Sequence, residues 1–182
     1  MTTYISILRG INVGGNRKIL MADLKNIYSD LKFKNIRTYI QSGNVIFDSP
    51  NTNENSIIEE TLQNAIHNTY GFEVKVIVRT NKELIDIFNN NPFLSNDNLD
   101  LKKLYLSFLK EEPSKDKLLN ISQIDTSPDL YNISGKDIFI YCNSKFSDCK
   151  ITNLFFEKQL KVPVTTRNWN TISKLHQMII DK

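Results

Sequence analysis

Residues 39–47 read Tyr-Ile-Gln-Ser-Gly-Asn-Val-Ile-Phe. Two β-favouring runs flank the Ser-Gly pair, which is typical of a β-hairpin with a tight turn. Residues 131–139 repeat the pattern as Tyr-Asn-Ile-Ser-Gly-Lys-Asp-Ile-Phe. A second match precedes each hairpin, because residues 4–8 read Tyr-Ile-Ser-Ile-Leu and residues 105–109 read Tyr-Leu-Ser-Phe-Leu. We therefore predict an internal duplication; the alternative is that strands and turns share a small alphabet of residues.

Around the first hairpin the sequence predicts the order strand, helix, strand, strand, helix, strand. The strands are expected at residues 4–9, 36–41, 44–48 and 73–79, and the helices at residues 21–31 and 58–70. Apolar residues recur at helical spacing in the helices and alternate along the last strand. This βαββαβ order is that of ferredoxin-like folds. A further helix is expected to be capped near Thr80 or Asn81 and to end by Pro92.

The second half predicts the same order around its own hairpin. Strands are expected at residues 103–109, 130–133, 137–142 and 162–166, and helices at residues 115–121, 151–160 and 171–180. Pro163 opens the last strand, which suits a sheet edge. The predicted fold class is α+β, with two tandem ferredoxin-like units that are each followed by an extra helix. The first unit spans residues 1–90, an Asn- and Asp-rich linker spans 91–102, and the second unit spans 103–182; a shorter polar linker is expected at 49–55.

The bulk composition favours an ordinary globular protein. The 182 residues are 40% hydrophobic and 24% charged, with a formal net charge of +3. This charge is too small to imply nucleic-acid binding by itself. The N-terminus lacks the pattern of a signal peptide, and no run of about 18 apolar residues suggests a membrane span. A cytoplasmic protein without a membrane partner is therefore expected, and the sequence does not predict its oligomeric state.

Two cysteines, Cys142 and Cys149, have a spacing that matches no zinc or dithiol motif. We interpret them as one buried and one surface thiol. Two histidines, His67 and His176, fall on separate predicted helices without metal-binding partners. No metal site and no cofactor are assigned.

The loop after the first strand, residues 9–18, reads Arg-Gly-Ile-Asn-Val-Gly-Gly-Asn-Arg-Lys. Its glycines let the backbone approach a ligand, and its basic residues come without an acidic one. The loop leads into a helix, whose N-terminal N–H groups favour an anion. It is not a Walker A loop, because Asn16 stands where the lysine is required. The alternative is a structural turn with solvated charges.

In a βαββαβ sheet the strand order is 4-1-3-2, which places the loop and the first hairpin turn at one edge. Gln41, Ser42 and Asn44 are then able to complete a polar pocket beside the basic loop. Alternatively, Ser42 and Asn44 satisfy backbone groups of the turn. The candidate ligand-binding residues are Arg9, Asn12, Gly14, Gly15, Asn16, Lys18, Ser42 and Asn44.

A third segment, residues 165–171, contains the only tryptophan. Arg167, Asn168 and Trp169 form a possible secondary site. The structural alternative is that Trp169 packs the last helix onto its sheet and Arg167 pairs locally. Asn170 or Thr171 is the expected N-cap of that helix.

Three segments together resemble the bacterial family called "domain of unknown function 1697". They are residues 9–15, 38–47 and 166–171. The resemblance covers essentially the whole chain. It implies a bacterial cytosolic protein with a ferredoxin-like α+β fold, and it supplies no activity, substrate or cofactor.

Three functions compete at this stage. The first is binding of a small anion, such as a nucleotide or phosphorylated metabolite, on the N–H groups of residues 13–16 and the side chains of Arg9 or Lys18. The second is RNA binding on the open sheet face, and the third is protein interaction without a small ligand. No catalytic constellation is recognised, so enzymatic activity is neither assigned nor excluded.

Alternation assigns the two faces of the first sheet. The residues expected to face the helices are Ile5, Ile7, Val45, Phe47, Val74 and Val76. Those expected on the open face are Tyr4, Ser6, Leu8, Arg37, Tyr39, Ile46, Lys75 and Ile77. Because the apolar members of the second set predict a covered surface, nucleic-acid binding is not expected.

Overall fold

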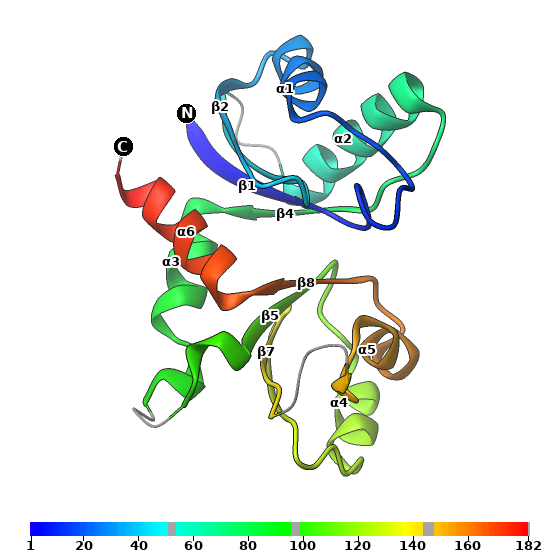
Figure 1. The fold of residues 1–182 in the computed structure, drawn as a ribbon, viewed down its shortest axis with the longest axis vertical. Helices are drawn as coiled ribbons and strands as arrows, with labels where there is room; N and C mark the ends of the chain where they lie inside the picture. Colours follow the sequence, from blue (N-terminus) through cyan, green and yellow to red (C-terminus); the bar gives the residue numbers. More distant parts are fainter. Residues whose placement is uncertain (51–53, 96–98, 144–147, 182) are drawn as a thin grey trace. The chain divides into compact units, whose positions relative to one another are not determined.

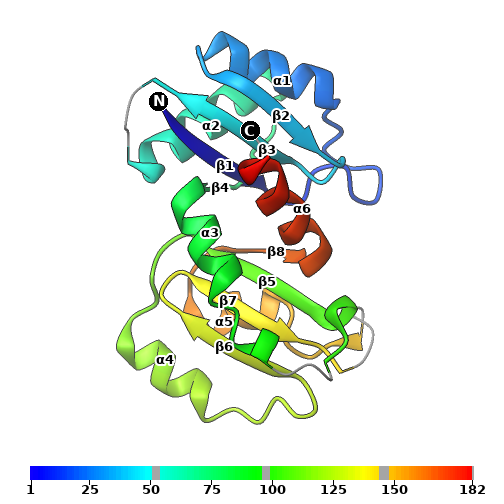
Figure 2. The same cartoon turned by 90° about the vertical axis from the view of Figure 1, so that its left-hand side faces the viewer.

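The chain forms an α+β structure with two four-stranded antiparallel sheets, each followed by helices (Figures 1 and 2). It is a computed structural model that describes residues 1–50, 54–95, 99–143 and 148–181. Residues 51–53 and 96–98, inside the two predicted linkers, and 144–147 lie outside the described residues. The chain divides into two compact units, one of residues 1–86 with 178–182 and one of residues 87–177.

The first sheet has the strand order β2-β3-β1-β4, which matches the order expected for it. Its elements are β1 (Thr2–Leu8), α1 (Met21–Asp30), β2 (Lys34–Tyr39), β3 (Asn44–Ser49), α2 (Asn55–Tyr70) and β4 (Val76–Thr80). The next helix, α3, spans Asn81–Asn89. Thr80 Oγ1 accepts a hydrogen bond from the Glu83 N–H at 3.1 Å, and Glu83 Oε2 accepts one from the Thr80 N–H at 2.7 Å. This reciprocal capping confirms the predicted start of α3.

The second sheet has the equivalent order, β6-β7-β5-β8. Its elements are β5 (Leu104–Leu109), α4 (Lys115–Ser122), β6 (Leu130–Ser134), β7 (Asp137–Tyr141), α5 (Asn153–Leu160) and β8 (Val164–Asn168). Helix α6 spans Trp169–Ile180. Short 3₁₀ turns at Pro92–Ser95 and Leu101–Lys103 occupy part of the predicted linker. Strand β8 lies at the sheet edge and begins after Pro163, as expected.

The predicted faces of β1 are wrong. Tyr4, Ser6 and Leu8 lie on the helix side of the sheet, where Tyr4 and Leu8 belong to the core of this unit. The hydroxyls of Ser6 and Tyr28 of α1 are hydrogen-bonded at 2.5 Å. Ile5 and Ile7 therefore lie on the opposite face. The prediction failed because both the odd and the even positions of β1 carry apolar residues. Alternation alone therefore does not identify the face that packs on the helices.

Each sheet has its own apolar core against its own helices. In the first unit, the rings of Phe33 and Phe47 lie 4.6 Å apart. In the second, Phe156 of α5 contacts Tyr131 edge-on with ring centroids 5.6 Å apart, among residues of β5, β7 and β8. Among the described residues, no helix is both long and apolar enough to cross a bilayer.

Candidate functional site

The glycine-rich loop runs between β1 and α1 and has a compact, irregular backbone. Five of its residues have positive φ, with values of 66° at Gly10, 56° at Asn12, 59° at Gly14, 79° at Gly15 and 48° at Arg17. The Asn16 N–H donates to the Val13 carbonyl at 3.1 Å, which closes the tip. The Asn16 N–H is therefore used within the loop, and anion binding on the N–H groups of residues 13–16 stays a prediction.

Asn12 fastens the loop to the hairpin turn. Its Nδ2 donates to the carbonyls of Ile19 at 2.9 Å and Gln41 at 2.8 Å, and its Oδ1 accepts from the Ile19 N–H at 2.9 Å. Asparagine tolerates positive φ better than most residues, which suits it to this position. The contact with Gln41 confirms that the loop and the turn share one edge of the sheet. Asn12 therefore shapes the candidate site.

Ser42 and Asn44 hold the turn itself. Asn44 is fully buried, and its Nδ2 donates to the Tyr39 carbonyl at 3.1 Å and to Ser42 Oγ at 3.0 Å. The structural alternative considered for these two side chains therefore describes them. Gln41, two residues before Gly43, is exposed and faces a pocket instead.

A surface pocket of about 400 Å³ lies between the loop, the turn and the start of α1. It is lined by Asn12, Gly15, Lys18, Ile19, Leu20, Met21 and Gln41. Leu20 occupies the N-cap position of α1 and makes no side-chain cap, so the first N–H groups of the helix lack that partner. The pocket thus combines one exposed cation, one exposed amide and a helix N-terminus.

The remaining predicted residues of this region have different surroundings. Arg9 is half-buried and its N–H donates to the Lys75 carbonyl at 2.9 Å. Arg17 is exposed, and its guanidinium lies over Gly10, where an added Cβ would be 3.5 Å from Nη1. Gly14 is exposed at the loop tip. Of the predicted ligand-binding residues, Asn12, Gly15 and Lys18 line the pocket.

Asp23 is the carboxylate nearest to the pocket along the chain, and it lies in the first turn of α1. It accepts a hydrogen bond from Tyr70 Oη of α2 at 3.3 Å. Partial burial and this carboxylate both raise the pKa of Tyr70 above its usual value. The contact joins the two helices.

A second, smaller pocket of about 200 Å³ lies between α2 and the start of β4. Its lining includes His67, Glu73 and Lys75, which are all exposed. Gln63 Oε1 at this pocket accepts from the Val76 N–H at 3.2 Å. This side chain covers the outer edge of β4, so part of the pocket's polar lining is structural.

Each residue of the possible secondary site has a contact within the second unit. Arg167 Nη1 donates to the Thr166 carbonyl at 2.9 Å, and burial lowers the pKa of Arg167 to about 10. Asn168 Oδ1 accepts from the Thr171 N–H at 2.8 Å. Asn168 therefore caps α6, and the prediction of Asn170 or Thr171 as N-cap is wrong. Trp169 is buried and stacks on Phe88 with ring centroids 5.4 Å apart.

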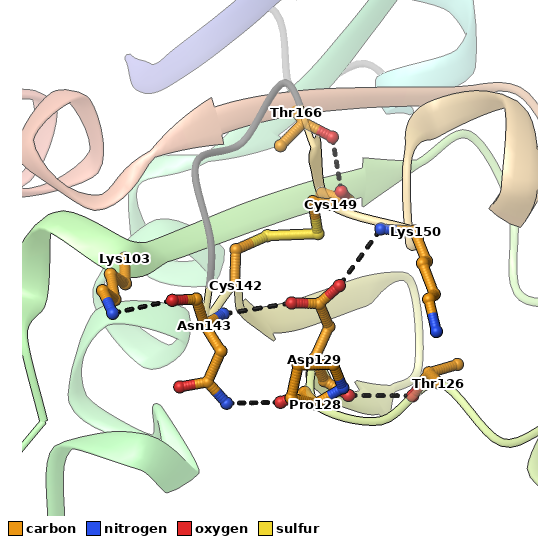
Figure 3. The surroundings of a disulfide bond; sticks show 10 residues. Lys103, Thr126, Pro128, Asp129, Cys142, Asn143, Cys149, Lys150 and Thr166 are labelled. Carbon is orange, nitrogen blue, oxygen red and sulfur yellow. Dashed lines mark hydrogen bonds between the residues drawn. A yellow bond between two sulfur atoms is a disulfide. The ribbon is translucent and has the colours of Figure 1, made fainter.

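The prediction of free cysteines is also wrong. Cys142 and Cys149 form a disulfide, and both are buried (Figure 3). Asp129 lies beside them, with a carboxylate oxygen within 4.8 Å of both sulfurs. Sequence reasoning missed Asp129 because only the folded loop brings it to cysteines 13 and 20 positions further along. An acidic residue just before a strand was the available signal.

Comparison with known proteins places the chain in a family. A family model described as "Protein of unknown function (DUF1697)" matches residues 1–139, more than half of the chain. The chain belongs to the DUF1697 family. This confirms the resemblance found in the sequence, although the match ends before residues 166–171. No curated protein matches the chain significantly.

One solved structure resembles the DUF1697 chain along its whole length. It is "The structure of conserved bacterial protein SP0830 from Streptococcus pneumoniae", with a TM-score of 0.76 and 24% sequence identity, covering 98% of each chain. At this identity the similarity concerns the fold alone.

Proposed function

We propose that this protein binds a small anionic ligand, a nucleotide or a phosphorylated metabolite, in the pocket at the start of α1. The observation that carries the proposal is the pocket of about 400 Å³ between Lys18, Gln41 and the first turn of the helix. A helix N-terminus attracts negative charge through its unpaired N–H groups. Lys18 adds an exposed cation, while Gln41 supplies both a donor and an acceptor for a neighbouring polar group.

The contacts within the glycine loop support two proposed roles for its residues, shaping the loop and binding the ligand. Asn12 and the Val13–Asn16 bridge fix the loop's shape, and Gly15 leaves the pocket wall without a side chain. Lys18 is exposed at the end of this scaffold. The proposed roles are therefore direct contact for Lys18, Gln41 and the helix N–H groups, and shaping for Asn12 and Gly15.

The RNA alternative loses support from the orientation of β1. Tyr4, which would have been a stacking residue, lies in the core with its ring 5.8 Å from that of Phe47. Arg37 Nη1 donates to the Met178 carbonyl near the end of α6 at 2.5 Å, where a cation complements the helix C-terminus. Two of the residues that suggested a nucleic-acid surface thus have structural contacts.

We further propose that both units are ferredoxin-like and arose by duplication, with boundaries near 90 and 103. Support comes from the equivalent strand orders of the two sheets. The two edge strands also match in detail. Arg79 of β4 pairs with Ile5, and Arg167 of β8 pairs with Leu106 in the same register. Each arginine donates through Nη1 to the carbonyl of the residue before it.

The ligand proposal is tested by calorimetric titration of the protein with inorganic pyrophosphate and, separately, with a nucleoside triphosphate. Lys18→Ala is expected to weaken binding by about 1–2 kcal/mol, or roughly 5–30-fold, because a charge-assisted hydrogen bond is lost. Lys25→Ala is the matched control: it removes an exposed lysine of α1 that does not line the pocket. Equal weakening of binding in both variants would show that the ligand is attracted by the overall charge of the surface and would contradict the proposal.

A further inference from the structure

The disulfide of the second unit joins two short segments that meet beside Asp129 (Figure 3). Cys142 directly follows β7, and Cys149 lies just before α5. Their Cα atoms are 5.9 Å apart, within the usual range for a disulfide. Cys142 has no exposed surface and Cys149 retains 4%, so both sulfurs lie in the core of this unit.

Asp129 positions the two cysteines through the backbone. Its Oδ1 accepts from the Asn143 N–H at 3.0 Å, and its Oδ2 accepts from the Lys150 N–H at 3.1 Å. Each donor belongs to the residue that follows one of the cysteines. A single buried carboxylate, 2% exposed, therefore joins both cysteine-bearing segments through their backbone N–H groups.

The backbone of Asp129 is itself held in place. Its N–H donates to the Thr126 carbonyl at 3.0 Å, and its carbonyl accepts from Thr126 Oγ1 at 2.9 Å. On the far side, Lys103 Nζ donates to the Asn143 carbonyl at 2.7 Å. None of these hydrogen bonds uses a sulfur atom.

Because these contacts do not involve the sulfurs, we expect them to persist when the bond is reduced. Two thiols in this apolar core would pack as small hydrophobic side chains. We propose that Cys142 and Cys149 form a reversible dithiol–disulfide pair, positioned by Asp129, which reacts with a small-molecule disulfide of the glutathione type. This site lies in the second unit and is independent of the proposed anion site.

The exchange proceeds in two balanced steps. The Cys149 thiol loses its proton and attacks one sulfur of glutathione disulfide. One glutathione thiolate leaves and takes up a proton. The Cys142 thiol then loses its proton and attacks the Cys149 sulfur, so that the second glutathione leaves and is protonated. Overall, two protein thiols are oxidised to one disulfide and one glutathione disulfide is reduced to two thiols.

The test uses the full chain equilibrated at pH 7 in buffers of reduced and oxidised glutathione. Alkylation of free thiols and intact-protein mass spectrometry then count the thiols, while near-UV circular dichroism reports the fold. We expect both thiols to disappear together in one transition, with the fold kept on both sides. Cys149→Ser is expected to lose the internal disulfide.

Asp129→Asn tests the positioning role. An amide offers one acceptor oxygen where the carboxylate offers two, so one backbone N–H loses its partner. The effective concentration of the thiol pair is expected to fall about tenfold. This is the change in equilibrium that corresponds to the loss of one hydrogen bond to a charged acceptor. Asp125→Asn is the control, because Asp125 is exposed in the same loop and accepts from the Ser127 N–H at 2.9 Å.

Several results would overturn the proposal. These are unfolding of the natural chain on reduction, independent titration of the two thiols, or an unchanged equilibrium in Asp129→Asn. Retention of one Zn²⁺ by the reduced chain under these buffers, lost in Cys149→Ser, would assign the site to a metal instead. If Asp129→Asn does not fold, the thiol count and the fold of the natural chain decide the question.

Discussion

Two residues, Asn12 and Gly43, hold the glycine-rich loop against the first hairpin. Asn12 contributes hydrogen bonds, and Gly43 lets the backbone of the turn approach Leu8 and Ile11 closely. Gly43 has a φ of 79°, and a Cβ added there would lie 2.7 Å from Leu8 Cβ and 2.8 Å from Ile11 Cδ1. The Gly43 carbonyl also accepts from the Leu8 N–H at 2.8 Å. The turn therefore requires a residue without a side chain, which gives the Ser-Gly pair its role in the fold.

Replacing Gly43 by alanine is expected to destabilise the chain by about 2–4 kcal/mol. Two costs add: a strained positive φ and a clash with Leu8 Cβ, which the backbone holds in place. Urea unfolding measures the change. Gly14→Ala is the matched control, since Gly14 also has positive φ, 59°, but no atom lies within 4 Å of an added Cβ. Equal losses in the two variants would show that the close approach contributes nothing.

At the scale of elements, the order of helices and strands followed from periodicity, but the faces and the contacts between distant segments did not. Helix α4 was predicted at 115–121 and spans Lys115–Ser122. Strand β1 was assigned to the wrong face, because Ser6 is polar yet buried against Tyr28. The disulfide was missed because Asp129 sets the approach of its two segments. Local patterns indicate local structure; these contacts are set by the tertiary fold.

The packing of α1 on β1 predicts an alkaline limit to stability. Burial raises the pKa of Tyr28 far above its usual value near 10, despite the hydrogen bond to Ser6. The unfolded chain therefore ionises first, and stability that is complete below pH ~10 falls above it by up to about 1.4 kcal/mol per pH unit. In Tyr28→Phe this part of the slope is expected to vanish, at a cost of about 1 kcal/mol at neutral pH.

Urea unfolding of the natural chain and of Tyr28→Phe between pH 8 and 11 measures this slope. Tyr105 and Tyr131 also have pKa values raised by partial burial, so some alkaline destabilisation is expected to persist in the variant. Identical slopes for the two proteins would contradict the assignment to Tyr28.

At the scale of the whole molecule, the two units repeat one design for protecting their edge strands. Glu59 of α2 accepts from the Val78 N–H at 2.9 Å, and Glu157 of α5 accepts from the Val164 N–H at 3.0 Å. In each unit a glutamate from the second helix thus covers a backbone donor of the last strand. Covering an exposed edge discourages pairing with another chain. The two halves differ at the features proposed to be functional, since the glycine loop belongs to one and the cysteine pair to the other.

Because each unit has its own core, a destabilising substitution in one unit is expected to lower the stability of that unit first. Phe156 is fully buried in the second core and contacts Phe155 and Tyr131. Phe156→Ala is expected to cost about 3–5 kcal/mol, since it removes a large side chain and leaves a cavity. Hydrogen exchange followed by mass spectrometry is expected to show the larger loss of protection in β5 and β7, with β1 and β3 less affected.

Phe47→Ala is the reciprocal variant, because Phe47 is the buried aromatic centre of the first core and its ring lies 5.1 Å from that of Tyr28. It should reverse the pattern, with β1 and β3 losing more protection than β5 and β7. The pair of variants separates two descriptions of the molecule. Opposite patterns mean that each sheet and its helices unfold as a cooperative unit, as expected from two cores of separate composition. The same uniform loss in both variants would mean that the chain has one cooperative core, and the boundary proposed between the units would then carry no energetic meaning.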